Sequence, residues 1–165
     1  MDRPTEQQLT SAYDEHGDAI FRFCYAHTGD RERALDLTQE TFVRVWRALS
    51  GGTVIERIRP FLYTTARHAC IDAARRPATE SLERLQEDGF DVADEQTLDP
   101  LLSTEVARVI RCIARLDEPY REAVALRYVS DLMPREIAEV IGESENVISV
   151  RITRGLQKLR ELLHL

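Results

Sequence analysis

A 24-residue acidic segment, residues 77–100, constrains the fold of this chain more than any other feature. It carries one basic side chain, Arg84, against eight acidic ones, and few large apolar side chains. A segment of this composition buries too little apolar surface to form a core, so we expect it to be extended or partly disordered. It also accounts for the whole net charge of −7, because acidic and basic side chains balance on either side of it. The sequence therefore predicts two neutral modules, 1–76 and 101–165, joined by an acidic linker, 77–100.

Helical periodicity fills both modules. Apolar side chains recur at three- and four-residue intervals, and glycine, proline or aspartate interrupts each run. The predicted helices are about 7–28, 31–49, 60–76, 101–116, 118–130, 134–141 and 145–163. No segment alternates as a half-buried strand would. The predicted fold class is all-α, with two small helical domains.

Composition argues against several classes of protein. No apolar run approaches the roughly 20 residues that span a bilayer, and the N-terminus lacks the pattern of a signal peptide, so we expect a cytoplasmic protein. Cys24, Cys70 and Cys112 are too scattered for a disulfide framework or a metal knuckle, and small buried thiols are the simplest interpretation. The histidines form no metal-spaced cluster, and no phosphate loop or nucleophile motif is present. We therefore expect no enzyme activity, no cofactor and no metal site.

Residues 134–148 carry the signature of a helix-turn-helix. Such a motif needs a small residue where its helices cross, a glycine in the turn and an apolar anchor in the second helix. Ala138, Gly142 and Ile148 meet these needs at suitable spacing, and Ser144 is placed to cap the second helix.

The last predicted helix, 145–163, has two distinct faces on a helical wheel. One arc carries the apolar residues Ile148, Ile152, Leu156, Leu159 and Leu163. Another carries Ser144, Val147, Arg151, Arg154 and Lys158. A basic stripe beside an anchoring face suits insertion into a DNA groove. The alternative is a core helix with a solvated basic edge.

Two further motifs complete the pattern. Residues 36–46 read DLTQETFVRVW, residues 61–76 read FLYTTARHACIDAARR, and residues 120–128 read YREAVALRY. Together with the helix-turn-helix, in this order and spacing, they closely resemble the extracytoplasmic-function group of bacterial sigma factors over roughly 8–76 and 104–163. The resemblance implies a factor that binds core RNA polymerase and directs promoter-specific transcription initiation. It assigns 1–76 to polymerase binding and the −10 element, and 101–165 to the −35 element.

The resemblance implies a polymerase-binding site on the second predicted helix. In such factors this helix docks on a coiled coil of the polymerase clamp, which carries over to Asp36, Gln39, Glu40 and Phe42. The spacing agrees, because residues three and four apart share one face of a helix. A capped, solvated acidic turn is the alternative. Phe42 suits the core as well as a contact, and Trp46 is expected in the core.

The resemblance also implies two DNA-binding sites. The first site melts and reads the −10 element, whose bases flip out of the stack. The resemblance assigns this role to Gly51, Gly52, Thr53, Val54, Arg67, His68, Ile71, Arg75 and Arg76. The second site reads the −35 element, and the resemblance assigns it to Ser144, Asn146, Val147, Val150, Arg151, Arg154 and Lys158. The chain departs from the family at His68 and Phe61, where Asn and Trp are usual, which bears on the −10 preference. Ser149 and Leu156 replace frequent basic residues, which implies fewer phosphate contacts.

The resemblance implies three partners: core RNA polymerase, promoter DNA and an anti-sigma factor. The polymerase would be bound through the clamp coiled coil and the flap of its large subunits. We expect no insertion into a membrane. The acidic linker resembles the one that such factors thread through the polymerase cleft, although it could be a simple tether. A sigma-like decoy that sequesters an anti-sigma factor is the alternative function. Local basicity in 145–158 is low for the family, which favours the decoy, whereas the intact residue sets of the first module favour a working factor.

Overall fold

The computed structural model describes residues 3–76 and 102–165, and within them every regular element is helical. The first module consists of α1 (Arg3–Thr28), α2 (Arg31–Ser50) and α3 (Ile58–Ala74). The second consists of α5 (Thr104–Ala114), α6 (Tyr120–Val124), the π-helical turn η1 (Ala125–Val129), α7 (Pro134–Ile141) and α8 (Glu145–Leu163). The all-α prediction is confirmed. The acidic linker lies outside the described residues.

The helix ends form where the sequence places capping residues. The Asp30 side chain accepts hydrogen bonds from the backbone N–H groups of Glu32 at 2.9 Å and Arg33 at 3.2 Å, which caps α2. The Ser144 hydroxyl accepts the Val147 N–H at 3.2 Å and caps α8 in the same way. Between α7 and α8, Gly142 adopts a left-handed conformation with φ of 81°, which a glycine tolerates without strain. The predicted turn of the helix-turn-helix is therefore present.

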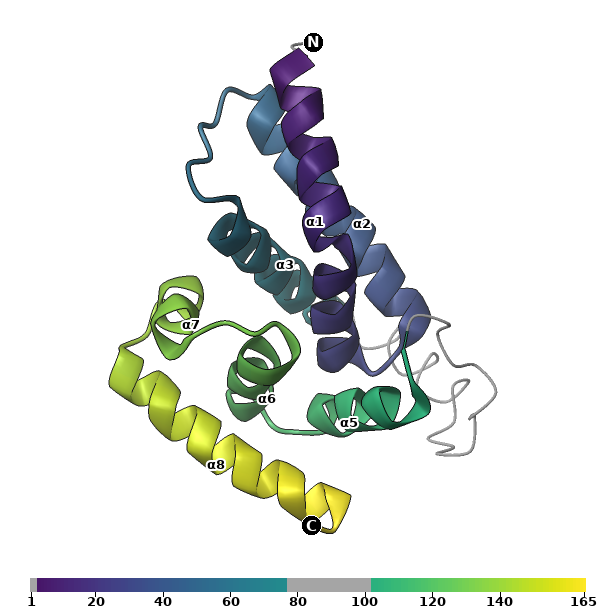
Figure 1. The fold of residues 1–165 in the computed structure, drawn as a ribbon, viewed down its shortest axis with the longest axis vertical. Coiled ribbons are helices and arrows are strands. Elements are labelled where there is room, and N and C mark those ends of the chain that lie inside the picture. The colour runs from purple at the N-terminus through teal and green to yellow at the C-terminus, as the bar shows by residue number, and fades with distance from the viewer. Residues whose placement is uncertain (1–2, 77–101) are drawn as a thin grey trace.

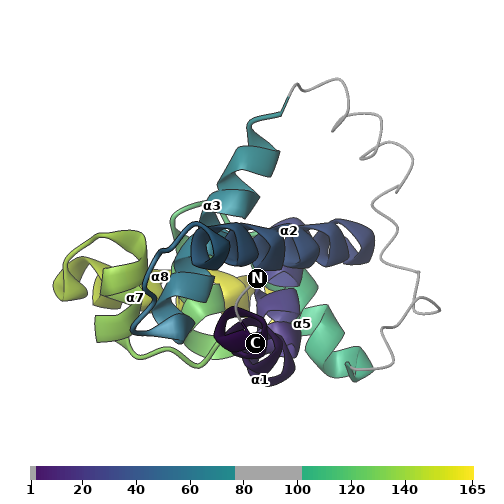
Figure 2. The ribbon, with the colours of Figure 1, turned by 90° about the horizontal axis from the view of Figure 1, so that it is seen from above.

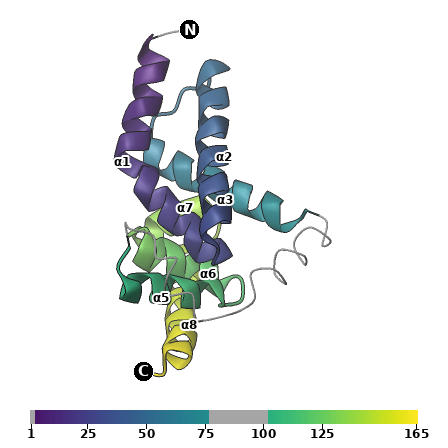
Figure 3. The ribbon, with the colours of Figure 1, turned by 90° about the vertical axis from the view of Figure 1, so that its right-hand side faces the viewer.

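In the first module, α1 and α2 lie side by side along the long axis of the molecule, and α3 crosses beside them (Figures 1 and 3). Their apolar faces form a common core that includes Ile20, Phe23, Val45, Leu62 and Tyr63. The Phe23 and Tyr63 rings meet edge to face, with centroids 5.7 Å apart. The core therefore fixes α3 against α1 and sets the direction of the helix that precedes the acidic linker.

In the second module, α8 is held against α6 by close backbone approach. A Cβ atom added at Gly155 would lie 2.5 Å from a methyl group of Val124 and 3.2 Å from Cβ of Tyr120. Only glycine permits this approach. Ile148, Ile152 and Leu159 are buried on the same side of α8, as the helical wheel predicts.

The two modules pack against each other, which the sequence did not indicate. Helix α1 contacts α5 and η1, and α3 contacts α7. Helices α5 and α7 lie on opposite sides of the second module, so this module spans the lower end of the first (Figures 1 and 2). The far face of the second module carries α8, which runs away from α1 and α2 to the C-terminus (Figure 3). We find no helix in residues 3–76 and 102–165 that is long and apolar enough to cross a membrane.

Candidate nucleic-acid and polymerase interfaces

The predicted polymerase-binding residues on α2 divide into an accessible polar face and a buried ring. Asp36 and Gln39 are exposed, and Glu40 is partly exposed beside them. Glu40 accepts a 3.0 Å hydrogen bond from Arg44, whose other end lies 3.0 Å from Asp72 on α3. The contact between Arg44 and Asp72 ties α2 to α3, and Asp36 and Gln39 remain on the open surface of α2.

Phe42 is a core residue in this structure, although the resemblance assigns it to the polymerase-binding surface. Its side chain is buried, and its ring packs edge to face on Tyr13 with centroids 5.0 Å apart. The physical reason is helix phase, because Phe42 falls on the face of α2 that turns towards α1 rather than on the face of Asp36. Trp46, expected in the core, is half-buried.

The predicted −10 residues are spread along α3 rather than gathered in one pocket. Residues 51–54 precede the helix and are exposed, and Arg75 and Arg76 follow its last turn, also exposed. The 17 residues of α3 separate these two groups by roughly 25 Å along the helix axis. His68 is exposed between them and Ile71 is half-buried. Only an extended ligand that runs along α3 could contact both ends.

Arg67 differs from the other predicted −10 residues because it is already paired. Its guanidinium binds the carboxylate of Glu122 on α6, in the second module. The Glu122 side chain is only 5% exposed. Burial raises the pKa of the Glu122 carboxyl, and the ion pair with Arg67 works against that rise. Arg67 therefore compensates a charge that the packing of the two modules removes from water.

His27, at the end of α1, is buried at the same junction. Its pKa is lowered to about 4, mainly by burial, with the positive charges of Arg121 and Arg67 acting in the same direction and Glu118 opposing them. Its Nδ1 atom has no hydrogen-bond partner in the described part of the chain. The ring packs on Phe23 with centroids 4.6 Å apart. A neutral imidazole therefore fills this position at neutral pH.

The predicted −35 residues form a largely open stripe on α8. Asn146, Val147, Val150, Arg154 and Lys158 are all exposed. Arg151 lies between them but is half-buried, with its guanidinium 3.4 Å from Glu143 in the turn before the helix. Ser144 is exposed too, although its hydroxyl is engaged as the helix cap. The Lys158 ammonium sits 5.4 Å from the centroid of the Tyr120 ring, which points the side chain back over α6.

Two arginines before and within α3 were missed by the sequence analysis. Arg57 donates from one guanidinium nitrogen to both carboxylate oxygens of Glu139, each at 2.9 Å. Arg59 donates to Glu136 at 3.2 Å and to the backbone carbonyls of Ser130 at 3.0 Å and Asp131 at 3.1 Å. No sequence signal connects these residues, because more than 70 positions separate the partners.

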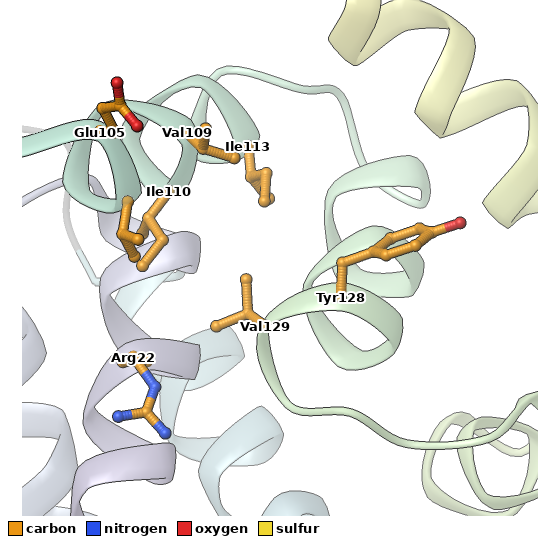
Figure 4. A pocket seen from close by; sticks show the side chains of 8 residues that line it. Arg22, Glu105, Val109, Ile110, Ile113, Tyr128 and Val129 are labelled. Atoms are coloured by element: carbon orange, nitrogen blue, oxygen red, sulfur yellow. The ribbon is translucent and has the colours of Figure 1, made fainter. Parts of the chain in front are cut away.

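A groove of about 490 Å³ opens where α1 meets α5 and η1 (Figure 4). Apolar side chains from the second module, including Val109, Ile113 and Val129, line most of it. Arg22 of α1 faces it from the first module and is half-buried, and no carboxylate in the described residues is within ion-pair distance of its guanidinium. The groove therefore combines an apolar wall with two charged side chains, Arg22 from α1 and the exposed Glu105 from α5.

Comparisons with known proteins agree with this arrangement of two helical modules. Residues 12–79 match the family model Sigma-70 region 2, and residues 107–159 match Sigma-70, region 4. Among curated relatives, the chain is 26% identical to the ECF RNA polymerase sigma factor SigW of Bacillus subtilis, over 91% of this chain and 86% of SigW. The chain belongs to the extracytoplasmic-function (ECF) group of sigma factors.

Some curated relatives of this ECF sigma factor are longer than this chain. This chain is 30% identical to the ECF RNA polymerase sigma factor BldN of Streptomyces coelicolor over 92% of its own length, and it spans 58% of the length of BldN.

Among solved structures, CnrH in complex with the cytosolic domain of CnrY matches 96% of this chain and 89% of CnrH, with a TM-score of 0.70 and 23% identity. The sigma factor RpoE in complex with the anti-sigma factor NepR from Bartonella quintana matches 96% of this chain and 98% of RpoE, with a TM-score of 0.67 and 18% identity. These two likenesses concern the fold alone.

The cysteines of the ECF sigma factor are free thiols in this structure. Cys24 and Cys70 are buried, as expected, whereas Cys112 is half-buried. Burial and a hydrogen bond with Cys24 raise the pKa of the Cys70 thiol, with the hydrogen bond as the larger cause. A thiol kept protonated in this way is a poor nucleophile.

Proposed function

We propose that this ECF sigma factor binds core RNA polymerase and directs initiation at particular promoters. The observation that carries the proposal is that two separate surfaces stand open where the family places its contacts. One is the polar face of Asp36, Gln39 and Glu40 on α2, and the other is the exposed stripe of α8. In this proposal the first module, 1–76, binds the polymerase clamp coiled coil and recognises the −10 element. The second module, 101–165, recognises the −35 element and binds the polymerase flap, and residues 77–100 link the two modules.

The −10 element would be read as a single strand along α3. The separation of the exposed loop 51–54 from Arg75 and Arg76 suits an extended strand rather than one compact ligand. Flipped bases would be held at the loop, and the arginines would neutralise phosphates further along. His68 and Ile71 lie between these ends and would meet the intervening nucleotides. Arg67 would join them once Glu122 releases it.

Run-off transcription with purified core polymerase tests this function directly. Core polymerase supplemented with the chain is expected to give discrete transcripts from native-host promoters, and core polymerase alone is expected to give none. A decoy would bind an anti-sigma factor and yet support no transcript on any template. Sequencing of RNA 5′ ends after overexpression would supply the promoters to use as templates. Absence of every discrete start under these conditions would reject the proposal in favour of the decoy.

An anti-sigma factor is the proposed regulatory partner, and the groove between α1 and α5 is its proposed docking site. The groove suits an amphipathic helix that places apolar side chains on Val109 and Ile113 and a carboxylate beside Arg22. Charge complementarity supports this choice, because a half-buried cation gains most from an acidic partner that excludes water. A segment bound there would bridge both modules. The solved structure of RpoE, similar in fold, contains the anti-sigma factor NepR.

Arg22→Glu is expected to weaken capture of the anti-sigma factor from unstressed cells of the native host. Loss of one charge-assisted contact costs about 1.5–3 kcal/mol, which corresponds to a factor of about 10–150 in affinity. Arg108→Glu is the matched control, because Arg108 is an exposed arginine of α5 that does not line the groove. Tagged variants would be purified, and the bound partner identified and quantified by mass spectrometry. If Arg22→Glu and Arg108→Glu recover equal amounts of the anti-sigma factor, the groove is not its docking site.

A further inference from the structure

Two carboxylates lie at the end of α8 that carries the proposed base contacts. Glu143 is in the turn before the helix, and Glu145 is the first residue of the helix. Both side chains are exposed. Like charges repel, so a carboxylate at this end weakens the attraction of α8 for the phosphates of any DNA sequence. Each acid therefore lowers the general affinity for DNA unless it makes a contact that compensates for the repulsion.

Only one of the two acids has such a contact. Oε1 of Glu143 accepts a hydrogen bond at 3.4 Å from a guanidinium nitrogen of Arg151, eight residues further along the chain. Glu145 has no ion pair within residues 3–76 and 102–165. The Arg151 side chain reaches back towards the N-terminus of α8, the direction in which helical side chains point. The contact therefore places the Arg151 guanidinium at the turn of the helix-turn-helix.

The backbone at Glu143 is held from both sides. The N–H groups of Gly142 and Glu143 both donate to the carbonyl oxygen of Ala138, at 2.8 and 3.2 Å, where α7 ends. Ser144, the next residue, caps α8 with its hydroxyl. A carboxylate attached to a backbone position of this kind is a well-defined support for the guanidinium that it binds.

Arg151 is more restricted than the other cations of the α8 stripe. Its side chain is 22% exposed, whereas Arg154 and Lys158 are exposed and have no acidic partner in the part of the chain that the structure describes. Burial raises the pKa of the Glu122 carboxyl, and the charge of Arg151 is one of those that oppose this rise. An arginine has five N–H donors, so the contact with Glu143 leaves enough of them for a bidentate contact with a guanine edge.

We propose that Glu143 is a positioning residue for −35 selectivity: it holds the Arg151 guanidinium in the orientation that contacts a base, and its charge disfavours DNA that lacks this base. The inference rests on the proposed function, in which α8 reads the −35 element. On a matching site, the contact between Arg151 and the base outweighs the repulsion between Glu143 and the phosphates. On other sequences the repulsion remains. Part of the selectivity would then come from a carboxylate outside the basic stripe.

Promoter binding by holoenzyme that contains Glu143→Gln separates positioning from the simple removal of a charge. Affinity is expected to rise more for mismatched −35 sites than for the matching site. Discrimination at the promoter position that Arg151→Ala affects should therefore fall, by about 2- to 10-fold. Glu145→Gln removes the same charge from an exposed acid that holds no arginine. It should raise affinity for all sequences by a similar factor and leave discrimination unchanged.

A double-mutant cycle makes the test specific to the contact between Glu143 and Arg151. The double variant Glu143→Gln/Arg151→Ala is expected to discriminate as poorly as Arg151→Ala alone, because no guanidinium is left to position. The proposal is overturned if the two losses of discrimination add. It is also overturned if Glu143→Gln keeps or sharpens the wild-type preference, or if Glu145→Gln reduces discrimination to the same extent.

NMR relaxation of arginine side chains in the free full-length chain tests the positioning step without polymerase or DNA. The Nε–H group of Arg151 is expected to have a higher order parameter than that of Arg154, and Glu143→Gln should lower it towards the value of Arg154. An Arg151 order parameter that does not respond to Glu143→Gln would overturn the proposal. Absence of selective promoter binding by wild-type holoenzyme would instead reject the proposed function, and the relaxation result would still decide whether Glu143 holds Arg151.

Discussion

Charge reversal of Asp36 and Glu40 to lysine is expected to abolish capture of core RNA polymerase. Both side chains lie on the accessible polar face of α2, and each carboxylate would accept charge-assisted hydrogen bonds from a basic partner. Loss of two such contacts costs about 3–6 kcal/mol, and repulsion adds to it, so the Kd should rise at least about 100-fold. The measurement is pull-down of the clamp subunit with the tagged double variant, followed by run-off transcription.

The control for this experiment is Asp14→Lys/Asp18→Lys. These are also two exposed acids four residues apart on a helix of the same module, so the net change in charge is identical. Arg44 lies 3.0 Å from Asp72 and is expected to keep this contact when Glu40 is replaced, so α2 should stay attached to α3. Helicity should be equal in both variants. Retained polymerase binding by Asp36→Lys/Glu40→Lys, or equal loss in the control, would reject the placement of the polymerase site.

The local features of the fold could be predicted because each depends on neighbouring residues. Asp30 and Ser144 cap helices through hydrogen bonds that span two or three residues, and Gly142 makes a turn that needs positive φ. The anchoring face of α8 follows from the helical period alone. Such signals are contained within one or two turns of chain.

The packing of the modules could not be predicted because its determinants are far apart in sequence. Glu122 looks like a solvated acid in a helix, yet it is buried against Arg67, 55 positions earlier. Arg57 and Arg59 have no partner nearby in sequence and acquire theirs from α7 and the end of η1. Opposite charges are abundant in both modules, so composition does not determine which of them meet.

The candidate site was predicted by residue type, and only the structure sorts its members by accessibility. Phe42 and Asp36 are six residues apart, which places them on different sides of α2, and the structure buries only Phe42. Arg67 and His68 are neighbours, yet only His68 is exposed. A motif predicts which positions are functional, but the accessibility of those positions depends on the element that packs against them.

Arg151→Ala is expected to change the sequence preference at the −35 element, whereas Lys158→Ala should weaken all sequences equally. Arg151 lies in the N-terminal half of α8, where helix-turn-helix proteins meet base edges, and Lys158 lies about two turns beyond. Loss of a base contact costs about 1–3 kcal/mol at one promoter position. Loss of a phosphate contact lowers the salt slope of binding by about one unit.

The structure adds a condition to this prediction, because Arg151 is 3.4 Å from Glu143 in the absence of DNA. When DNA binds, Glu143 must either release the Arg151 guanidinium or hold it in an orientation that can contact a base. In both cases the base contact is lost when Arg151 is replaced by alanine. The matched control is Arg160→Ala: Arg160 is exposed on the same helix, and nine residues place it about half a turn around from Arg151. Holoenzyme binding to a set of −35 variants would be measured at several salt concentrations. If Arg151→Ala and Lys158→Ala behave alike, or if Arg160→Ala alters preference as Arg151→Ala does, the stripe on α8 is not the surface that reads the −35 element.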